Sequence, residues 1–454
     1  MRISTIVVAL SALLAAAGTP SVGVVARMFR DSSRGSALAR PVLKDEWRTA
    51  SFKTCRDAPS PEFTRGTRAQ ARQEGGEWSM ELTERLLQLC APPVLDNRVA
   101  RTPPMGWNSW NHFGCDVSAQ LIRETADAMV ASGLRDAGYQ YVVIDDCWQV
   151  ARDARGRLVA DSARFPGGMK PLADYVHSRG LKFGIYTDAG RRTCQGRPGT
   201  YGSEEVDART FAEWGVDYVK EDWCNAEGLV PTVQYAKFRD ALAQTGRPIV
   251  FSICEWGSAS PWDWGPATGN LWRTTTDIED SWTSMLANLD ISGQHAAAAR
   301  SGAWNDPDML EIGNGGMTDD EYRAHFSLWA IMAAPLIAGN DLRTMSPATR
   351  EILINREVIA VDQDSLGVQG TLVEERSPEL QVWMKPLADG SRAVVLLNRS
   401  ALQTVIAASW WRLRLSGPAH VRDLWSHADL GTFSDRFSVT VPAHGAVMVR
   451  VTPQ

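Results

Sequence analysis

Carboxylates gather directly after short apolar runs in the middle of the chain. Asp145 and Asp146 follow YVVI, and Glu221 and Asp222 end the run YVKED. Neighbouring carboxylates repel and raise each other's pKa values unless hydroxyl groups, cations or metal ions satisfy them. Two carboxylates are what hydrolysis of a glycosidic bond requires, because one protonates the leaving oxygen and the other attacks the sugar or activates water.

Acids follow seven of eight such runs, and tryptophans accompany several of them. A lone Asp in this position often only caps the next helix, but capping explains seven clusters with adjacent acids poorly. A sugar donates its hydroxyl groups into carboxylates while its C–H surface packs on indole faces. The segments are TPPMGWNSW (102–110), DDCW (145–148), TDAG (187–190), KEDWC (220–224), CEWG (254–257), DIED (277–280), NDPDM (305–309) and NDL (340–342).

The composition favours a neutral substrate. The chain of 454 residues is 44% hydrophobic and 22% charged, with a net charge of -6 and 18 Trp. No basic patch stands out, so we expect neither nucleic acid nor an anionic membrane as a partner. The chain has 7 His and neither an HExxH nor a C-x-x-C motif, so we expect no metal ion and no cofactor.

The acid-bearing segments need a scaffold that brings strand ends together. Apolar runs alternate with helix-like stretches, which is typical of a parallel sheet built from βα units. Eight runs predict a (β/α)8 TIM barrel, whose C-terminal strand ends converge on one cavity. We expect strands at 104–109, 139–145, 181–187, 216–221, 247–253, 271–276, 301–306 and 334–339, and helices at 119–138, 171–180, 206–215, 232–246 and 321–333.

The two ends of the chain differ from this middle part. We divide the sequence into a barrel at 101–368 and an antiparallel β-sandwich at 369–454, where short strands alternate with Gly, Pro, Asn and Ser. The expected strands of this module are LQVWMKPL, RAVVLLN, QTVIAAS, WWRLRLS, FSVTVPAH and GAVMVRVT. Residues 1–19 resemble a signal peptide, which predicts a secreted or periplasmic protein. Alternatively the start lies further downstream, with 86–95 in a shorter leader. Residues 20–100 form an extension of unknown role, and no stretch predicts a membrane span.

The middle segments closely resemble glycoside hydrolase family 27, the α-galactosidases. The resemblance rests on TPPMGWNSWNHFGC, YVVIDDCW, KFGIYTDAG, GVDYVKEDWC, WRTTTDIEDSW, GAWNDPDML and LWAIMAAPLIAGNDLR. It covers about residues 101–368 and continues more loosely through the β module. It implies a retaining hydrolase of terminal α-galactosides.

The resemblance also implies roles for individual residues. Asp222 would be the nucleophile and Asp277 the general acid/base. Cys115 would pair with Cys147, and Cys194 with Cys224. The residues that would bind the sugar are Trp110, Asp145, Asp146, Tyr186, Lys220, Cys254, Trp256, Arg273 and Asp308.

Strand alternation assigns directions to the side chains of YVKED. Lys220 and Asp222 lie two residues apart and share one face, so the ammonium group should keep the nucleophile ionised. Glu221 should point away from the cavity. Trp223 stands where the family usually has a smaller or different residue, which predicts a narrowed or aromatic-lined leaving-group side.

The sequence also allows other roles for several of these residues. Tyr186 and Cys254 could be packing residues, Asp308 could cap a helix, and Cys55 and Cys90 could pair or stay free. An α-N-acetylgalactosaminidase or β-L-arabinopyranosidase of the same family is possible, although GSASPWDWG and the short Asp146 favour galactose. A barrel that only binds carbohydrate is the alternative from another class. The sequon Asn398-Arg399-Ser400 is taken as a chance match on a turn. The natural substrate and the oligomeric state are not determined by the sequence.

Overall fold

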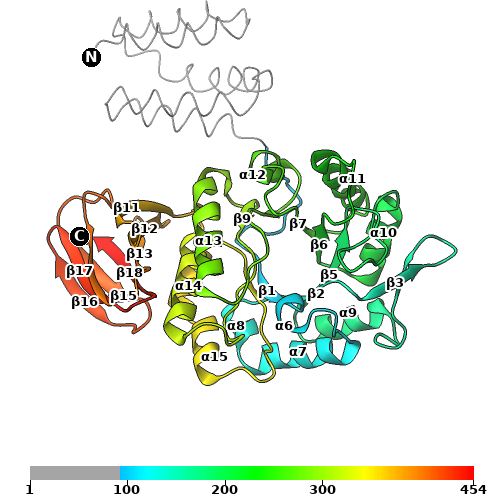
Figure 1. The fold of residues 1–454 in the computed structure, drawn as a ribbon, viewed down its shortest axis with the longest axis horizontal. Coiled ribbons are helices and arrows are strands. Elements are labelled where there is room, and N and C mark those ends of the chain that lie inside the picture. The colour runs from blue at the N-terminus through cyan, green and yellow to red at the C-terminus, as the bar shows by residue number, and fades with distance from the viewer. Residues whose placement is uncertain (1–92) are drawn as a thin grey trace, which may run out of the picture. The chain divides into compact units, whose positions relative to one another are not determined.

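Eight parallel strands form the central sheet of the protein (Figure 1). The computed structural model describes residues 93–454, so the predicted signal peptide, most of the extension, Cys55 and Cys90 lie outside the described residues. The strand order is β10-β1-β2-β5-β6-β7-β8-β9. The strands are β1 (Met105–Asn108), β2 (Tyr141–Ile144), β5 (Lys182–Asp188), β6 (Tyr218–Asp222), β7 (Val250–Ile253), β8 (Leu271–Arg273), β9 (Trp304–Asp306) and β10 (Leu336–Ala338).

The two ends of this sheet meet and close the barrel. Leu310, shortly after β9, forms a parallel bridge with Ala338 of β10. Its N–H donates to the carbonyl of Ile337 at 2.8 Å, and its own carbonyl accepts the N–H of Gly339 at 3.0 Å. The predicted (β/α)8 barrel is thereby confirmed, and all eight predicted strands are present; all except β8 start later than predicted, and β5 and β6 each end one residue later.

Neighbouring positions of β2 and of β6 pack into different cores. Tyr141 and Val143 of β2 belong to a buried cluster in the barrel interior, together with Tyr218 of β6. Val142 and Val219, one position further along their strands, belong to the larger core between strands and helices. The alternation is that of any β-strand, and it sorts the side chains of β6 into two environments.

The helices surround the strands, as Figure 1 shows. The stretch predicted as one helix at 119–138 divides at Gly133, whose φ of 85° only Gly adopts readily, into α7 and α8. The other predicted helices are confirmed within two residues, whereas α13, α15, α16 and the hairpin of β3 and β4 were not predicted. The bounds are α6 (Trp110–Phe113), α7 (Ala119–Ala131), α8 (Leu134–Ala137), α9 (Met169–Ser178), α10 (Glu204–Trp214), α11 (Pro231–Gln244), α12 (Pro261–Trp264), α13 (Trp282–Ser292), α14 (Asp319–Ile331), α15 (Pro347–Leu353), α16 (Arg356–Asp362), β3 (Gln149–Arg152) and β4 (Leu158–Ala160), with 3-10 turns η1 (Gly265–Ala267) and η2 (Gly293–Ala298).

The chain changes to antiparallel β-structure after α16. One sheet has the order β11-β12-β13-β18-β15-β16, and β14 pairs with β17 in a second. The side chains between them form a separate apolar core. The strands are β11 (Thr371–Ser377), β12 (Leu380–Pro386), β13 (Arg392–Asn398), β14 (Thr404–Ser409), β15 (Ala419–Asp423), β16 (Asp429–Phe433), β17 (Arg436–Val441) and β18 (Gly445–Pro453).

One predicted strand of this module is wrong. WWRLRLS (410–416) forms turns, because the N–H groups of Arg412 and Leu413 both donate to the carbonyl of Ser409. Trp410 and Leu413 are buried three positions apart while Trp411 is 67% exposed, which is the spacing of a helical turn and not of a strand. No helix within residues 93–454 is both long and apolar enough to cross a lipid bilayer.

Candidate active site

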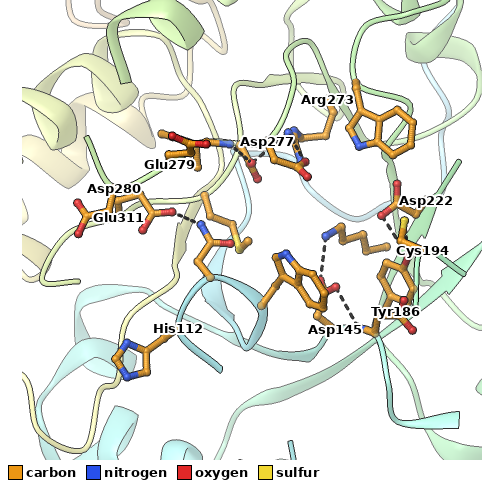
Figure 2. A pocket seen from close by; sticks show the side chains of 18 of the residues that line it. His112, Asp145, Tyr186, Cys194, Asp222, Arg273, Asp277, Glu279, Asp280 and Glu311 are labelled. Atoms are coloured by element: carbon orange, nitrogen blue, oxygen red, sulfur yellow. Dashed lines mark hydrogen bonds and ion pairs between the residues drawn. The ribbon is translucent and has the colours of Figure 1, made fainter. Parts of the chain in front are cut away.

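A cavity of about 430 Å³ opens at the C-terminal ends of the barrel strands. Figure 2 shows Asp145, Tyr186 and Asp222 on one side and Glu279, Asp280 and Glu311 on the other, with Arg273 and Asp277 between them. Among the predicted site residues, all but one line this cavity. They are Trp110, Asp145, Asp146, Tyr186, Lys220, Asp222, Trp256, Arg273, Asp277 and Asp308.

Asp222 lies at the end of β6 and is almost completely buried, with 6% of its surface exposed. The hydroxyl of Tyr186 donates to its Oδ2 at 3.1 Å, and the N–H of Trp223 donates to its Oδ1 at 3.0 Å. Burial raises the pKa of Asp222 to about 6, and the positive charge of Lys220 opposes that rise. The carboxylate is therefore fixed by two donors and ionised above about pH 6.

Lys220 points into the cavity, as the strand alternation predicts, but its close partner is Asp145. Its Nζ lies 2.9 Å from Oδ2 of Asp145, which also accepts the side-chain amide of Asn108 at 2.8 Å. Burial alone would lower the pKa of Lys220, but Asp145 and the other acids nearby raise it well above its usual value. Lys220 thus acts on Asp222 through its charge, while its ammonium group bonds to Asp145.

Asp146 is held by backbone groups. Its Oδ1 accepts the N–H of Cys147 at 2.6 Å, and its Oδ2 accepts the N–H of Gln195 at 3.0 Å. Burial raises the pKa of Asp146, and these two hydrogen bonds oppose the rise. Both carboxylates that follow β2 are therefore fixed in place.

Arg273 joins the two carboxylates at the other side of the cavity. Its Nη2 lies 3.0 Å from Oδ1 of Asp277 and 3.0 Å from Oδ2 of Asp308. The side chain of Asp277 is 68% exposed, whereas Arg273 and Asp308 are buried. Asp308 also accepts the N–H of Ile278 at 2.9 Å, so it fixes the loop that carries Asp277.

Cys254 is the predicted sugar-binding residue that does not line the cavity. It is 1% exposed, and its sulfur accepts a hydrogen bond from Arg273 at 3.7 Å. It is the free cysteine of the described residues. Burial raises the pKa of its thiol well above the usual value, so the sulfur is a neutral packing partner of Arg273.

Glu221 lies on the opposite face of β6 and does not line the cavity. It is buried, and neither carboxylate oxygen has a hydrogen-bond partner among the described residues. Burial, followed by the charges of Asp188, Glu204 and Asp207, raises its pKa well above the usual value. Glu221 is therefore a neutral acid in the layer outside the barrel.

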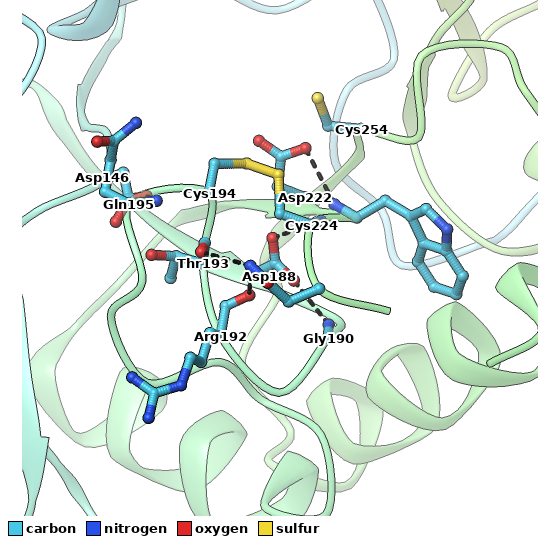
Figure 3. The surroundings of a disulfide bond; sticks show 12 residues. Asp146, Asp188, Gly190, Arg192, Thr193, Cys194, Gln195, Asp222, Cys224 and Cys254 are labelled. Carbon is cyan, nitrogen blue, oxygen red and sulfur yellow. Dashed lines mark hydrogen bonds between the residues drawn. A yellow bond between two sulfur atoms is a disulfide. The ribbon is translucent and has the colours of Figure 1, made fainter. Parts of the chain in front are cut away.

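Two disulfides follow the strand ends, and Cys194 of the second one lines the cavity. Cys115 is joined to Cys147 and Cys194 to Cys224, the pairs that the resemblance implies. Figure 3 shows the second disulfide next to Asp222. Asp188 accepts the N–H groups of Gly190 at 2.7 Å and of Cys224 at 2.8 Å.

The packing below this disulfide requires a glycine. A Cβ on Gly190 would lie 2.0 Å from the carbonyl oxygen of Cys224, so no larger residue fits without movement. Asp188, Asp222 and the two sulfur atoms lie close enough together to suggest a metal site. The sulfur atoms are bonded to each other, however, and offer no thiolate ligands.

The sequence alone did not reveal the side of the cavity around Glu311. Asn111 and Asn314 donate their side-chain amides to its two carboxylate oxygens. Burial raises the pKa of Glu311 to about 7. Glu311 follows NDPDM by two residues, so its position after β9 was the available signal. His112 also lines this side, together with Glu279 and Asp280 of DIED, one of the acid-bearing segments of the sequence.

Several backbones at the strand ends adopt left-handed conformations. The φ angles are 57° at Trp256, 83° at Asp308 and 77° at Cys147. Such angles are uncommon outside glycine and cost free energy. Trp256 and Asp308 line the cavity and Cys147 directly follows Asp146, which also lines it, whereas Arg414, His427 and His444 adopt positive φ angles in the β-domain.

A closed parallel barrel with acids, an arginine and tryptophans around one cavity at its strand ends defines a glycoside hydrolase. The family model "Alpha galactosidase A" matches residues 102–364, and the model "Alpha galactosidase C-terminal beta sandwich domain" matches 377–451. The chain belongs to the alpha-galactosidase family.

Individual relatives agree with this membership. The alpha-galactosidase of Cyamopsis tetragonoloba is 51% identical over 365 residues, which are 80% of this chain and 89% of that protein. The structure of the Saccharomyces cerevisiae alpha-galactosidase with raffinose is 32% identical, with a TM-score of 0.75, and covers 80% of this chain and 100% of that one. The alpha-N-acetylgalactosaminidase of Gallus gallus is 42% identical over 79% of this chain and 96% of that protein.

Proposed function

We propose that the protein hydrolyses terminal, non-reducing α-D-galactosyl residues by double displacement, with Asp222 as nucleophile and Asp277 as general acid/base. The observation that carries the proposal is that both acids open into one cavity in contrasting environments. Asp222 is buried and held by two donors, whereas Asp277 is exposed and held by Arg273. A nucleophile needs a fixed carboxylate, and an acid/base must exchange protons with water.

The first displacement forms a covalent galactosyl-enzyme. An oxygen of Asp222 attacks the anomeric carbon while protonated Asp277 donates its proton to the glycosidic oxygen, so the bond to the leaving group breaks. Tyr186 and the N–H of Trp223 keep the attacking carboxylate oriented. In the second displacement Asp277 takes a proton from water, the water oxygen attacks the anomeric carbon, and Asp222 leaves as a carboxylate. The product keeps the α configuration.

The remaining residues of the cavity suit a neutral sugar. Asp145 and Asp146 are fixed acceptors for hydroxyl groups, and Lys220 supplies a donor beside them. Trp110 and Trp256 present aromatic surface to the C–H groups of the ring. Raffinose-type oligosaccharides and galactomannan side chains are the substrates that we propose. Two disulfides support export, because such bonds persist in oxidising compartments.

The test is release of nitrophenol from the α-galactoside, compared with the α-N-acetylgalactosaminide and the β-L-arabinopyranoside. We expect clear preference for the α-galactoside, with α-galactose as the first product seen by NMR. Preference for another sugar would replace the proposed substrate. Turnover of none of the three by a folded protein would favour a barrel that only binds carbohydrate.

A further inference from the structure

A second cavity, of about 490 Å³, lies beside the first. We call it the outer pocket; it is lined by Trp223, Trp256, Cys194 and residues 224–227. Trp256 and Cys194 line both cavities, so the two lie next to each other. A molecule bound in the first cavity can therefore extend into the outer pocket.

The indole of Trp223 is held rigidly although it is only partly buried. It stacks on Tyr235 with ring centroids 5.4 Å apart and an angle of 28° between the planes. Tyr235 stacks in turn on Trp264 at 5.8 Å and 29°. The three aromatic rings thus form a stack, and Trp223 at one end of it lines the outer pocket. A fixed aromatic face loses little conformational entropy when a ligand packs on it.

The loop that follows Trp223 is also fixed. Asn225 donates its side-chain amide to the carbonyl of Thr193 at 3.0 Å, and the disulfide joins Cys224 to Cys194. Figure 3 shows Thr193 and Cys194 next to Cys224. The walls of the outer pocket are therefore preformed on the side of β6.

Charge limits the kind of ligand. The described residues that line the first cavity include eight Asp or Glu but only Lys220 and Arg273 as permanent cations, and Glu227 adds an acid to the outer pocket. An anionic group would be repelled here. A neutral, hydroxyl-rich ligand with apolar faces fits the two indoles and the surrounding acceptors.

The reaction defines which part of a substrate reaches this place. Asp277, which would protonate the leaving oxygen, follows β8, and Trp256 follows the adjacent strand β7. The leaving group therefore departs on the side of Trp256, which lines both cavities. The galactosyl ring itself occupies the first cavity.

We propose that the outer pocket binds the leaving-group sugar of an α-galactosyl oligosaccharide, with Trp223 as its stacking platform. This inference rests on the proposed function. It assigns Trp223 to recognition of the leaving group and predicts that the enzyme distinguishes oligosaccharides from galactosides with a small leaving group. Because Trp223 directly follows Asp222, the two cavities share one strand end.

The experiment compares two substrates of different leaving group. α-Galactosyl fluoride releases fluoride, which needs no outer pocket, whereas raffinose releases a disaccharide. In Trp223→Asn we expect kcat/KM for raffinose to fall about three- to tenfold more than for the fluoride, the loss of one aromatic stacking contact. Trp223→Phe keeps a ring on Tyr235 and should restore most of the difference. Trp411→Asn removes an exposed tryptophan of the β-sandwich and is the matched control.

Each other outcome overturns the proposal. An equal loss with both substrates would mean that Trp223 only packs on Tyr235 and supports Asp222. No loss with either would mean that the outer pocket is not used. The proposed function fails separately, if the wild-type chain hydrolyses neither substrate.

Discussion

Nη2 of Arg273 lies 3.0 Å from Oδ1 of Asp277 and, at the same distance, from Oδ2 of Asp308. One buried guanidinium therefore connects the exposed acid to a carboxylate that is fixed by the backbone. This connection sets where the proton donor of the proposed reaction stands.

Replacement of Arg273 by Lys should reduce catalysis, because Lys is shorter and lacks the rigid planar guanidinium that places Nη2 between the two carboxylates while Nη1 contacts Cys254. We expect kcat/KM on nitrophenyl α-galactoside to fall about 10- to 100-fold, a part of the usual contribution of a general acid. α-Galactosyl fluoride needs no proton on its leaving group, so its loss should be smaller. Equal losses on the two substrates would contradict the positioning role.

Asp222→Asn should abolish turnover by about 10⁴-fold or more, because the amide cannot form the ester intermediate. Galactose binding should persist, since Asp145, Asp146 and Lys220 are unchanged. Calorimetric titration with galactose and initial rates on nitrophenyl α-galactoside measure the two properties. Residual activity near the wild-type level would refute the nucleophile assignment.

The activity should have an acid limb set by Asp222. Its pKa is raised to about 6, chiefly by burial, and only the ionised form can attack. Below this pH the carboxyl is protonated, so kcat/KM should decrease about tenfold per pH unit as the pH falls. A pH profile between roughly pH 4 and 8 checks the prediction. A profile that is flat through pH 6 would show that another group limits the rate.

Glu221 should make the folded state less stable as the pH rises. Its pKa is raised in the folded state, so between the unfolded value and the folded value the native protein binds more protons than the unfolded chain. The free energy of unfolding then declines by up to about 1.4 kcal/mol per pH unit in that window. Gln cannot ionise, so Glu221→Gln should make the slope shallower in urea unfolding at several pH values, while the other buried acids such as Asp188 and Asp362 keep their contributions. Identical slopes for both proteins would mean that Glu221 finds a partner when it ionises.

The two disulfides should contribute similarly to stability, since they span 32 and 30 residues. Loss of either, as Cys115→Ser/Cys147→Ser or Cys194→Ser/Cys224→Ser, should cost roughly 3–4 kcal/mol in the chain-entropy model. Cys224 of the second pair lies two residues after Asp222, so loss of this disulfide should lower kcat more than loss of the first. Thermal unfolding and initial rates separate the two effects. An unchanged kcat in the Cys194/Cys224 variant would show that the disulfide does not support the nucleophile.

The sequence predicted the barrel and most of the cavity for identifiable physical reasons. Apolar runs such as YVVI indicate a strand that is buried on both faces. Closure of the barrel brings the acids after these strands together, and this does not depend on the conformation of the loops. Side-chain partners across loops leave no such signal. The ion pair of Lys220 with Asp145, the burial of Cys254 behind Arg273 and the outer pocket all depend on contacts between strand ends. The strand prediction for WWRLRLS was wrong because the spacing of its apolar residues fits a helical turn as well as a strand.

The alternation of side chains along β6 places two adjacent acids on opposite faces of the strand and in different protonation states. Asp222 reaches the cavity and ionises near pH 6, whereas Glu221, one peptide unit earlier, stays neutral in the layer behind it. Insertion of a single residue between Tyr218 and Lys220 would reverse the parity of the strand end. Glu221 would then point into the cavity and Asp222 would point into the layer behind the strand, so the chemistry of this enzyme depends on an even count of residues from Tyr218.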